Sequence, residues 1–350
     1  VKKRQETILA QMLDQKMISQ EEYEAAVAEE LNYRPYEEYQ QEIKSTYSYF
    51  TDEVIKDVIN DLMTEKGYSR LDEVWANADK FPNTEKYGEI PQSAMVITDK
   101  QGNIVGIAGG RGEKTSSRGF SYASDARRQP GSSIKPLATY GPAMDAGIAT
   151  PDTTVYDRAL IQDEEGNPWP MNDGKYPTGR AMTVKEGMTR SLNTISAQLL
   201  KQLTPQKSYE FMTQQLGFKL VDSRTNEDGT VQSDIDLAPL ALGALTDGVT
   251  VREMAGGFST FINDGVYGGT RTYTKVTDSE GNTIMENTPN TDKGFTNVRT
   301  DYYMLDCLQN VTAHGTAYGI QLDGVETGGK TGTTTSNTDI WFCGITPKYS

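Results

Sequence analysis

Three short motifs in this chain of 350 residues carry the hydroxyl, amide and amine groups that acyl transfer uses. They are Ser132–Lys135 (SSIK), Ser191–Asn193 (SLN) and Lys330–Thr334 (KTGTT), in that order along the chain. A serine hydroxyl is a poor nucleophile until a base removes its proton, and a lysine held in its neutral form can act as that base. The residue types therefore predict acyl transfer through a serine nucleophile.

The first motif has a spacing that suits this chemistry. A proline and a glycine interrupt the chain directly before Ser132, so we predict that a helix begins there. Residues i and i+3 share a helix face, which brings the Lys135 amine within reach of the Ser132 hydroxyl. Neutrality of Lys135 near pH 7 requires a depressed pKa, which burial and a nearby cation such as Lys330 would supply. Backbone N–H groups of Ser132, at the helix start, and of Thr333, at a strand edge, are the predicted oxyanion-hole donors.

Each motif also has an ordinary structural interpretation. Ser132 and Ser191 are residues that commonly cap helices, and Lys330–Thr334 is a plausible polar strand end. All three in this order form the signature of penicillin-binding proteins and serine β-lactamases. Their joint occurrence therefore favours catalysis over three unrelated capping positions.

Composition excludes several other classes of function. The chain carries 34 basic and 49 acidic residues, for a net charge of -15, which disfavours binding to nucleic acid or to anionic lipid through a basic patch. The longest apolar stretch, Leu237–Leu245, is too short for a membrane helix and contains Pro239 and Gly243. We expect a soluble chain of about two domains.

The counts of histidine and cysteine argue against metal and histidine-based chemistry. One histidine, His314, and two cysteines, Cys307 and Cys343, match no metal-site spacing, so neither a metal nor another cofactor is predicted. We expect both cysteines to be buried free thiols, although they could pair in an oxidising compartment. His314 lies in a segment typical of a turn or helix end, so the catalytic base is not predicted to be histidine.

The hydrophobic pattern predicts an α+β architecture. Strands are expected at both ends of the main domain, which suggests a sheet that joins the first strands to the last. Ser19 and Glu22 form a capping-box pattern for the second of two N-terminal helices. The other predicted elements are a helix through 54–62, a turn-rich segment at 68–92, hairpins at 93–108 and 273–285, helices at 135–147, 184–203, 208–216, 251–263 and 302–312, and two strands after 325.

The sequence around the motifs resembles class A (bifunctional) penicillin-binding proteins. Arg128–Pro136 (RQPGSSIKP) is similar to their nucleophile segment, and Ile8–Glu30 resembles the tail that follows their glycosyltransferase module. Further similar segments are Leu240–Gly243, Gly248–Thr250, Glu253–Ala255, Gly265–Tyr267, and Lys330–Thr334 with the following Asp339, Trp341–Phe342, Gly344 and Thr346–Pro347. The resemblance implies a transpeptidase fold shared with serine β-lactamases, in which helices cover both sides of a central antiparallel sheet, preceded by a helical linker.

The same resemblance implies a role for each motif residue in a D,D-transpeptidase. Ser132 would attack the penultimate D-Ala carbonyl of a peptidoglycan stem peptide, with Lys135 as the favoured base. Ser191 would relay the proton, and Asn193 would hold the substrate amide. Substrate binding, chiefly of the terminal carboxylate, would fall to the third motif: Lys330, Thr331, Gly332, Thr333 and Thr334.

The resemblance also implies partners, a location and a division of the chain. The partners would be a D-Ala-D-Ala donor, an amine acceptor and β-lactam antibiotics, with cell-wall synthesis or division proteins as further candidates. The parent protein would sit on the outer face of the bacterial plasma membrane, anchored by an N-terminal helix that this chain lacks. We expect a helical tail at 1–45, a helix and linker at 46–92, and a transpeptidase domain at 93–350, truncated at its C-terminal end.

Some features depart from that family pattern, and two other functions stay open. The chain contains no glycosyltransferase catalytic part, and the stretch after Tyr68 is shorter than the family usually has. A serine β-lactamase or D,D-carboxypeptidase would pass the acyl group to water, and a non-catalytic β-lactam sensor would keep Ser132 without cross-linking. Glu286 and Asn290 match one lactamase pattern, but they lie in a turn-rich arm and are interpreted as a chance match.

Overall fold

The computed structural model describes residues 10, 13, 18–28, 92–111, 120–162, 165–277, 279–335 and 337–350. The chain divides into two compact units, the first of which is Val1–Thr46 with Glu113–Arg118. In that unit the described helix is α2 (Gln20–Ala28). Its predicted capping box is confirmed, because Ser19 Oγ accepts from Glu22 N (3.2 Å) while Glu22 Oε2 accepts from Ser19 N (2.8 Å). The helix predicted before it lies mostly outside the described residues, and the elements predicted between residues 54 and 91 lie wholly outside them.

The second unit begins with the predicted hairpin, formed by β1 (Met95–Thr98) and β2 (Ile104–Ala108). The turn is closed by Asp99, whose carboxylate accepts from the backbone N–H of Gln101 (3.0 Å) and Asn103 (2.9 Å). This arrangement is an Asx-type turn of the kind that aspartate favours.

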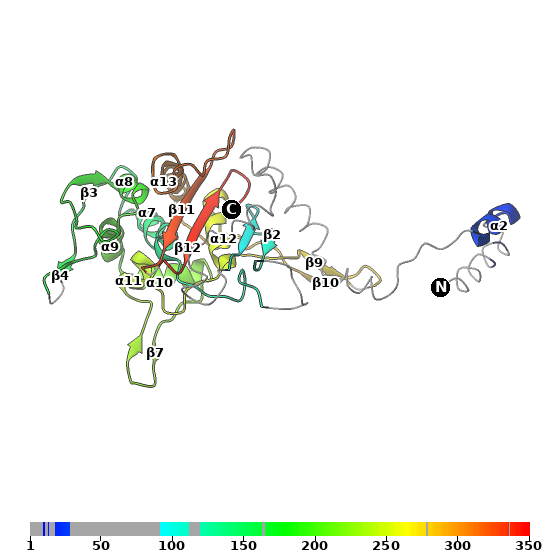
Figure 1. The fold of residues 1–350 in the computed structure, drawn as a ribbon, viewed down its shortest axis with the longest axis horizontal. Coiled ribbons are helices and arrows are strands. Elements are labelled where there is room, and N and C mark those ends of the chain that lie inside the picture. The colour runs from blue at the N-terminus through cyan, green and yellow to red at the C-terminus, as the bar shows by residue number, and fades with distance from the viewer. Residues whose placement is uncertain are drawn as a thin grey trace, which may run out of the picture. The chain divides into compact units, whose positions relative to one another are not determined.

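A second antiparallel pair, β11 (Gly328–Thr333) and β12 (Ile340–Ile345), holds the third motif. β11 contacts α13 (Thr300–His314), and it also contacts η2 (Gly131–Ile134), which carries the first motif. Figure 1 shows β11 and β12 crossing the body beside α13.

The expected single sheet is found as separate pairs in the described part of the chain. The backbone of β1 is bonded to the C-terminal residues instead of to β12, since Thr98 N donates to Ser350 O (2.8 Å) and Ser350 N to Thr98 O (3.0 Å). Both hairpins pack on α12 (Val251–Ser259), which positions them without a shared ladder. The prediction of α+β strand and helix content is confirmed, and the end of β1 meets the last residues of the chain through the antiparallel bridge of Asp99 and Tyr349, although β1 and β12 share no ladder of their own.

The predicted helices are present with breaks that the hydrophobic pattern did not reveal. Residues 184–203 form α8 (Val184–Thr189) and α9 (Asn193–Leu203), which are separated at Ser191 by a left-handed backbone with φ of 56°. The segment after Lys135 forms η3 (Pro136–Tyr140) and α7 (Gly141–Asp145). The remaining elements are β3 (Thr154–Tyr156), β4 (Ile161–Gln162), β5 (Pro168–Trp169), β6 (Ala181–Thr183), α10 (Pro205–Glu210), η4 (Phe211–Gln215), β7 (Arg224–Thr225), β8 (Val231–Gln232), α11 (Leu237–Leu242), η5 (Thr260–Ile262), β9 (Lys275–Thr277) and β10 (Thr283–Glu286).

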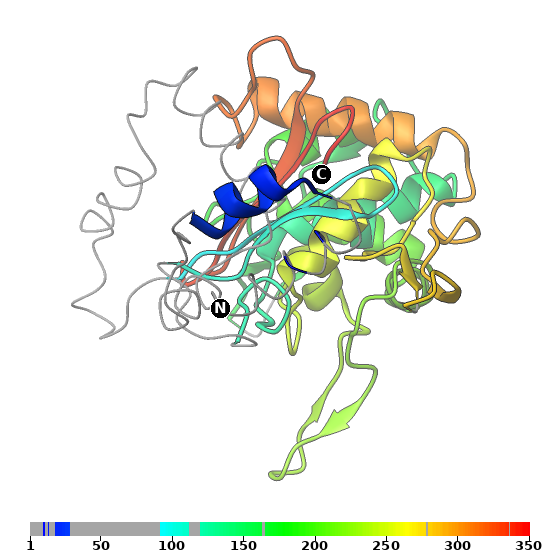
Figure 2. The ribbon, with the colours of Figure 1, turned by 90° about the vertical axis from the view of Figure 1, so that its right-hand side faces the viewer.

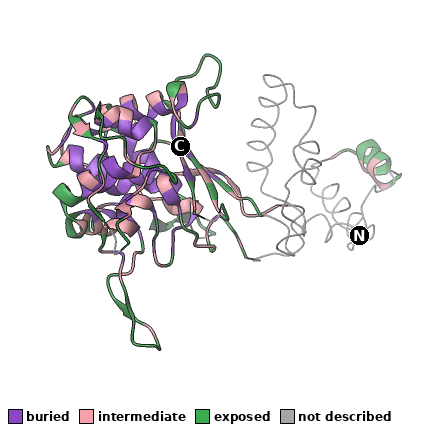
Figure 3. Cartoon of the chain, turned by 60° about the vertical axis from the view of Figure 1, so that its left-hand side comes forward, coloured by how far each residue is buried: buried purple, intermediate pink, exposed green. Residues whose placement is uncertain are grey.

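The core lies among these helices and beneath β11, where the buried residues concentrate (Figure 3). By contrast, the β7–β8 hairpin projects away from the body of its unit (Figure 2). Cys307 and Cys343 are buried free thiols, as predicted, and burial raises the pKa of each to about 12. His314 is the last residue of α13, which confirms its place at a helix end.

Two features are absent from the part of the chain that the structure describes. No helix there has the length and apolar character needed to cross a bilayer. No cluster of three or more His, Cys, Asp or Glu side chains in that part of the chain has an arrangement suited to a metal ion.

Candidate active site

The first motif forms a 3-10 turn, where an α-helix was predicted. In an α-helix Ser132 O would accept from the N–H of residue 136, but that residue is Pro136, which has none. The N–H of Lys135 donates to Ser132 O instead, which is the i to i+3 pattern of a 3-10 helix. Because i and i+3 side chains eclipse in that geometry, a 3-10 turn is as compatible as an α-helix with Ser132 and Lys135 on one face, although the hydrogen bonds of Lys135 Nζ go to Ser191 and Asn193.

Two glycines allow the backbone of this turn to lie directly against the backbone of β11. A Cβ on Gly332 would lie 2.2 Å from Pro130 O, and a Cβ on Gly131, whose φ is +51°, would lie 2.6 Å from Thr333 O. Only residues without a side chain permit this approach. The backbone at the start of η2 therefore lies next to that of Thr333, in keeping with the two oxyanion-hole donors predicted from the sequence.

Lys135 is fully buried, with a relative exposure of 0%. Its Nζ donates to Ser191 O (2.9 Å) and to Asn193 Oδ1 (2.7 Å). Burial lowers the pKa of Lys135 well below its ordinary value, and the positive charge of Lys330 lowers it further. Both effects favour the neutral amine, which is the form that can remove a proton.

Lys330 is the second fully buried lysine. Its Nζ donates to Ser191 Oγ (2.8 Å) and to Thr331 O (2.9 Å). Burial lowers the pKa of Lys330 to about 7, a fall that the nearby Cys343 thiol partly opposes. Within the described part of the chain neither buried lysine has a carboxylate partner, so the site can accept an anion from outside.

Ser191 connects the two lysines. Its carbonyl oxygen accepts from Lys135, and its hydroxyl accepts from Lys330. The left-handed backbone at Ser191 turns the chain between α8 and α9 and is unusual for a residue other than glycine. The chain conformation thus places one residue of the second motif between the lysines of the first and third.

The predicted substrate-binding residues lie in the second half of β11, except Thr334, which directly follows it. Thr331 is half-buried and shares a hydrogen bond of 2.7 Å with the hydroxyl of Thr316. Thr333 is exposed, while the half-buried Thr334 is fixed by a hydrogen bond from its N–H to Asp339 O (3.1 Å). Thr316 was not predicted from the sequence, because one threonine between a helix and a strand carries no distinguishing pattern.

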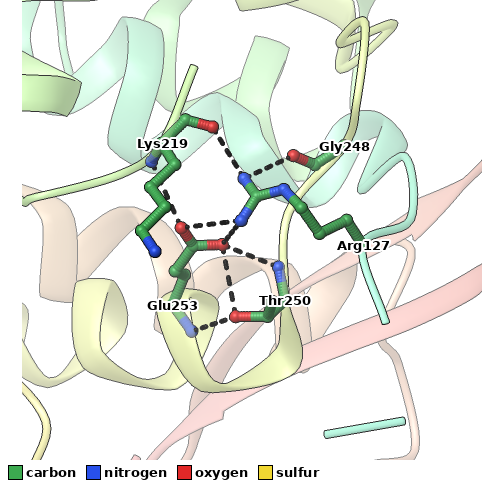
Figure 4. A network of polar contacts seen from close by, with 5 residues as sticks. All are labelled: Arg127, Lys219, Gly248, Thr250 and Glu253. Carbon is green, nitrogen blue, oxygen red and sulfur yellow. Dashed lines mark hydrogen bonds and ion pairs between the residues drawn. The ribbon is translucent and has the colours of Figure 1, made fainter. Parts of the chain in front are cut away.

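Arg127 fixes the segment that leads into Ser132 (Figure 4). Its guanidinium donates to Glu253 (3.1 and 3.2 Å) and to the backbone oxygens of Lys219 and Gly248 (2.7 and 2.9 Å). Glu253 also completes the capping box of α12 with Thr250. The start of α12 and the approach to the nucleophile are therefore held by one polar network.

The next residues extend this anchorage to β12. Arg128 Nε forms an ion pair of 2.6 Å with Asp339, just before β12 begins. Trp341 Nε1 donates to Gln129 O (3.0 Å). The segments that resembled the family on either side of the site are thus in direct contact.

The family model for the penicillin-binding-protein transpeptidase domain matches residues 92–350. The chain belongs to this family. The resemblance read from the motifs is therefore confirmed. Among curated proteins, penicillin-binding protein 1A of Clostridium acetobutylicum is 33% identical, over 89% of this chain and 39% of that protein. Penicillin-binding protein 4 of Bacillus subtilis is 32% identical, over 75% of this chain and 39% of that protein.

Solved structures agree on the fold. Penicillin-binding protein 1A of Haemophilus influenzae aligns with a TM-score of 0.59 at 21% identity, covering 99% of this chain and 71% of that one. The D,D-transpeptidase domain of a peptidoglycan glycosyltransferase from Eggerthella lenta aligns with a TM-score of 0.58 at 21% identity, covering 77% and 73%. This penicillin-binding-protein domain therefore has the transpeptidase fold that the motifs implied. It spans about two fifths of the length of the curated relatives named above.

Proposed function

We propose that this chain is the cross-linking part of a peptidoglycan D,D-transpeptidase with Ser132 as its nucleophile. The observation that carries the proposal is the pair of buried lysines joined through Ser191, with no carboxylate partner among the described residues. One amine serves as a base for the adjacent serine, and the other attracts an anionic substrate terminus. Membership of the family supports the same reaction class.

Acylation begins when neutral Lys135 removes the Ser132 proton as Ser132 Oγ attacks the penultimate D-Ala carbonyl carbon. The oxyanion is stabilised by the backbone N–H groups of Ser132 and Thr333. The C–N bond then breaks, and the terminal D-Ala leaves as an amine that takes a proton relayed through Ser191. Because Ser191 Oγ accepts a hydrogen bond from Lys330, its own proton is free to be donated.

The second half-reaction reverses these proton transfers. An amine of a neighbouring stem peptide attacks the acyl-enzyme ester, forms the new amide bond and releases Ser132. The donor's terminal carboxylate is bound by Lys330 with the Thr331 and Thr333 hydroxyls, and Asn193 holds the substrate amide.

A β-lactam acylates Ser132 in the same way. Its leaving nitrogen stays covalently attached to the acyl group, so the adduct persists. The outer face of the plasma membrane, where stem peptides are joined, is the proposed location.

The lactamase alternative receives no support from Glu286. That residue ends β10, where it is exposed and pairs with Lys275 across the hairpin.

Intact-mass analysis after incubation with a penicillin tests the proposal. We expect one stable adduct per chain, and cross-linked product when a D-Ala-D-Ala peptide and an acceptor amine are supplied. Rapid nitrocefin turnover without an accumulating adduct would instead indicate a β-lactamase. A stable adduct without consumption of the donor peptide would indicate a sensor, and absence of any adduct would reject serine acylation.

Replacing Lys330 by Met should move the acid limb of the pH profile of the acylation rate to higher pH. The Lys330 charge helps to lower the pKa of Lys135, so its removal raises that pKa and reduces the neutral fraction of the base. On the acid side the rate falls about tenfold for each unit by which the limb moves. Stopped-flow acylation from pH 5 to 9 measures the shift, and Lys185→Met, at a surface ion pair with Asp306, is the matched control. A limb that stays in place would contradict the coupling.

A further inference from the structure

A buried carboxylate, that of Asp157, lies near the site. Its hydrogen bonds go to residues other than the two buried lysines. Asp157 follows β3 and is 1% exposed. Its Oδ1 accepts from Asn172 Nδ2 (2.7 Å) and Thr194 Oγ1 (2.7 Å), and its Oδ2 accepts from the N–H and the hydroxyl of Thr178 (both 2.8 Å). Although burial raises the pKa of Asp157, these hydrogen bonds outweigh it and hold the pKa below its ordinary value. The side chain is therefore ionised at neutral pH and only accepts hydrogen bonds.

An acceptor at Asp157 dictates how the Asn172 amide is oriented. The Asn172 NH₂ group must face the carboxylate, so its Oδ1 faces the other way, toward the start of α9. There Oδ1 accepts from Asn193 N (2.8 Å) and Thr194 N (3.2 Å). The residue at the N-cap of α9 is Leu192, which has no side-chain acceptor, so Asn172 supplies the cap from a distant loop.

The same loop orients the Asn193 side chain. Asn193 Nδ2 donates to the carbonyl oxygen of Met171, the residue before Asn172 (2.8 Å). Its Oδ1 is therefore turned toward Lys135 Nζ, which donates to it at 2.7 Å. Gln198 also ties α9 to the end of β3, because its Nε2 donates to Tyr156 O at 2.9 Å. Two contacts from one loop therefore meet at Asn193: the Asn172 side chain accepts from its backbone N–H, and the Met171 carbonyl oxygen orients its side-chain amide.

We propose that Asp157 and Asn172 are positioning residues, which hold the Met171–Asn172 segment against the start of α9 and so keep the Met171 carbonyl where it turns the Asn193 amide toward the Lys135 amine. The inference rests on the proposed function, since it assigns a purpose to the position of the base. Neither residue touches the reacting atoms. Their contribution is to keep an acceptor, and never a donor, facing Lys135, so that the lone pair of the neutral amine remains available to Ser132.

The experiment reverses the hydrogen-bonding partners in the full chain. Asp157→Asn puts an NH₂ group where the neighbouring groups all donate hydrogen bonds. Asn172→Asp places a second carboxylate directly against that of Asp157. Each single variant should lower the saturating acylation rate by penicillin about 10- to 100-fold, the scale of a displaced catalytic group. The double variant Asp157→Asn/Asn172→Asp restores a donor facing an acceptor, so most of the rate should return. Thr178→Val removes one hydrogen bond from the same carboxylate without affecting Asn172, and its rate should stay close to wild type.

Rates are taken from the fraction of molecules that form an adduct, so partial unfolding lowers the amplitude and leaves the rate constant unchanged. Single variants with wild-type rate constants would overturn the inference, as would a folded double variant that is no faster than the singles. If the single variants do not fold, the double variant alone decides. Wild-type chain that forms no adduct would reject the proposed function and this inference together. Wild-type acylation with unaffected variants would reject the inference alone.

Discussion

The Ser132→Ala variant is expected to form no penicillin adduct while it unfolds at the wild-type temperature. Ser132 is half-buried, and within the described residues its hydroxyl makes no hydrogen bond, so its removal costs the fold little. The same atom is the proposed nucleophile, and without it no covalent bond to the antibiotic can form. Intact mass for the adduct and thermal unfolding for the fold measure the two effects separately.

The neighbouring serine provides a matched control. Ser133 is fully buried, and its hydroxyl donates to Pro130 O at 2.7 Å. Ser133→Ala should therefore lower the free energy of unfolding by about 1 kcal/mol, the usual contribution of one hydrogen bond, and still be acylated. An adduct that persists in Ser132→Ala, or disappears only in Ser133→Ala, would place the nucleophile elsewhere.

The sequence predicted the members of the site better than the way in which they meet. The three-residue spacing of Ser132 and Lys135 is local, so elementary helix geometry was enough to predict that they belong to one site. The approach of Ser191 and Lys330 depends on contacts between distant segments, and the order of the motifs indicated it only through the family resemblance. The 3-10 turn was in principle predictable, because Pro136 removes the N–H that an α-helix needs.

Other features carried no usable signal in one sequence. The break between α8 and α9 falls at Ser191, a residue type that seldom adopts a left-handed backbone, within an unbroken apolar pattern. Asp157 and Asn172 are single polar residues in turn-rich segments, where solvent exposure is the ordinary expectation. Their burial becomes evident only when the loops fold back against α9.

The Lys135→Met variant is expected to lose about 10²- to 10⁴-fold in acylation rate, the usual contribution of a general base. Methionine has nearly the length of lysine and fills the same buried space, so the loss reflects the missing amine. The stopped-flow rate with a saturating penicillin is the measurement. Lys201→Met, an exposed change on α9, should keep the wild-type rate. A Lys135→Met variant that acylates at the wild-type rate would remove Lys135 from the role of base.

The same variant should also change how stability depends on pH. In the fold the pKa of Lys135 is depressed, whereas in the unfolded chain it returns to about 10.4. Between those two pKa values the unfolded state binds more protons, so this lysine makes the wild-type free energy of unfolding rise with pH. Lys135→Met removes that contribution, and its stability relative to wild type should be highest at low pH and fall as pH rises toward 10. Denaturant titrations at pH 6, 8 and 10 test the sign, and a relative stability that instead increases with pH would show that the buried amine is charged in the fold and so cannot begin the reaction as a base.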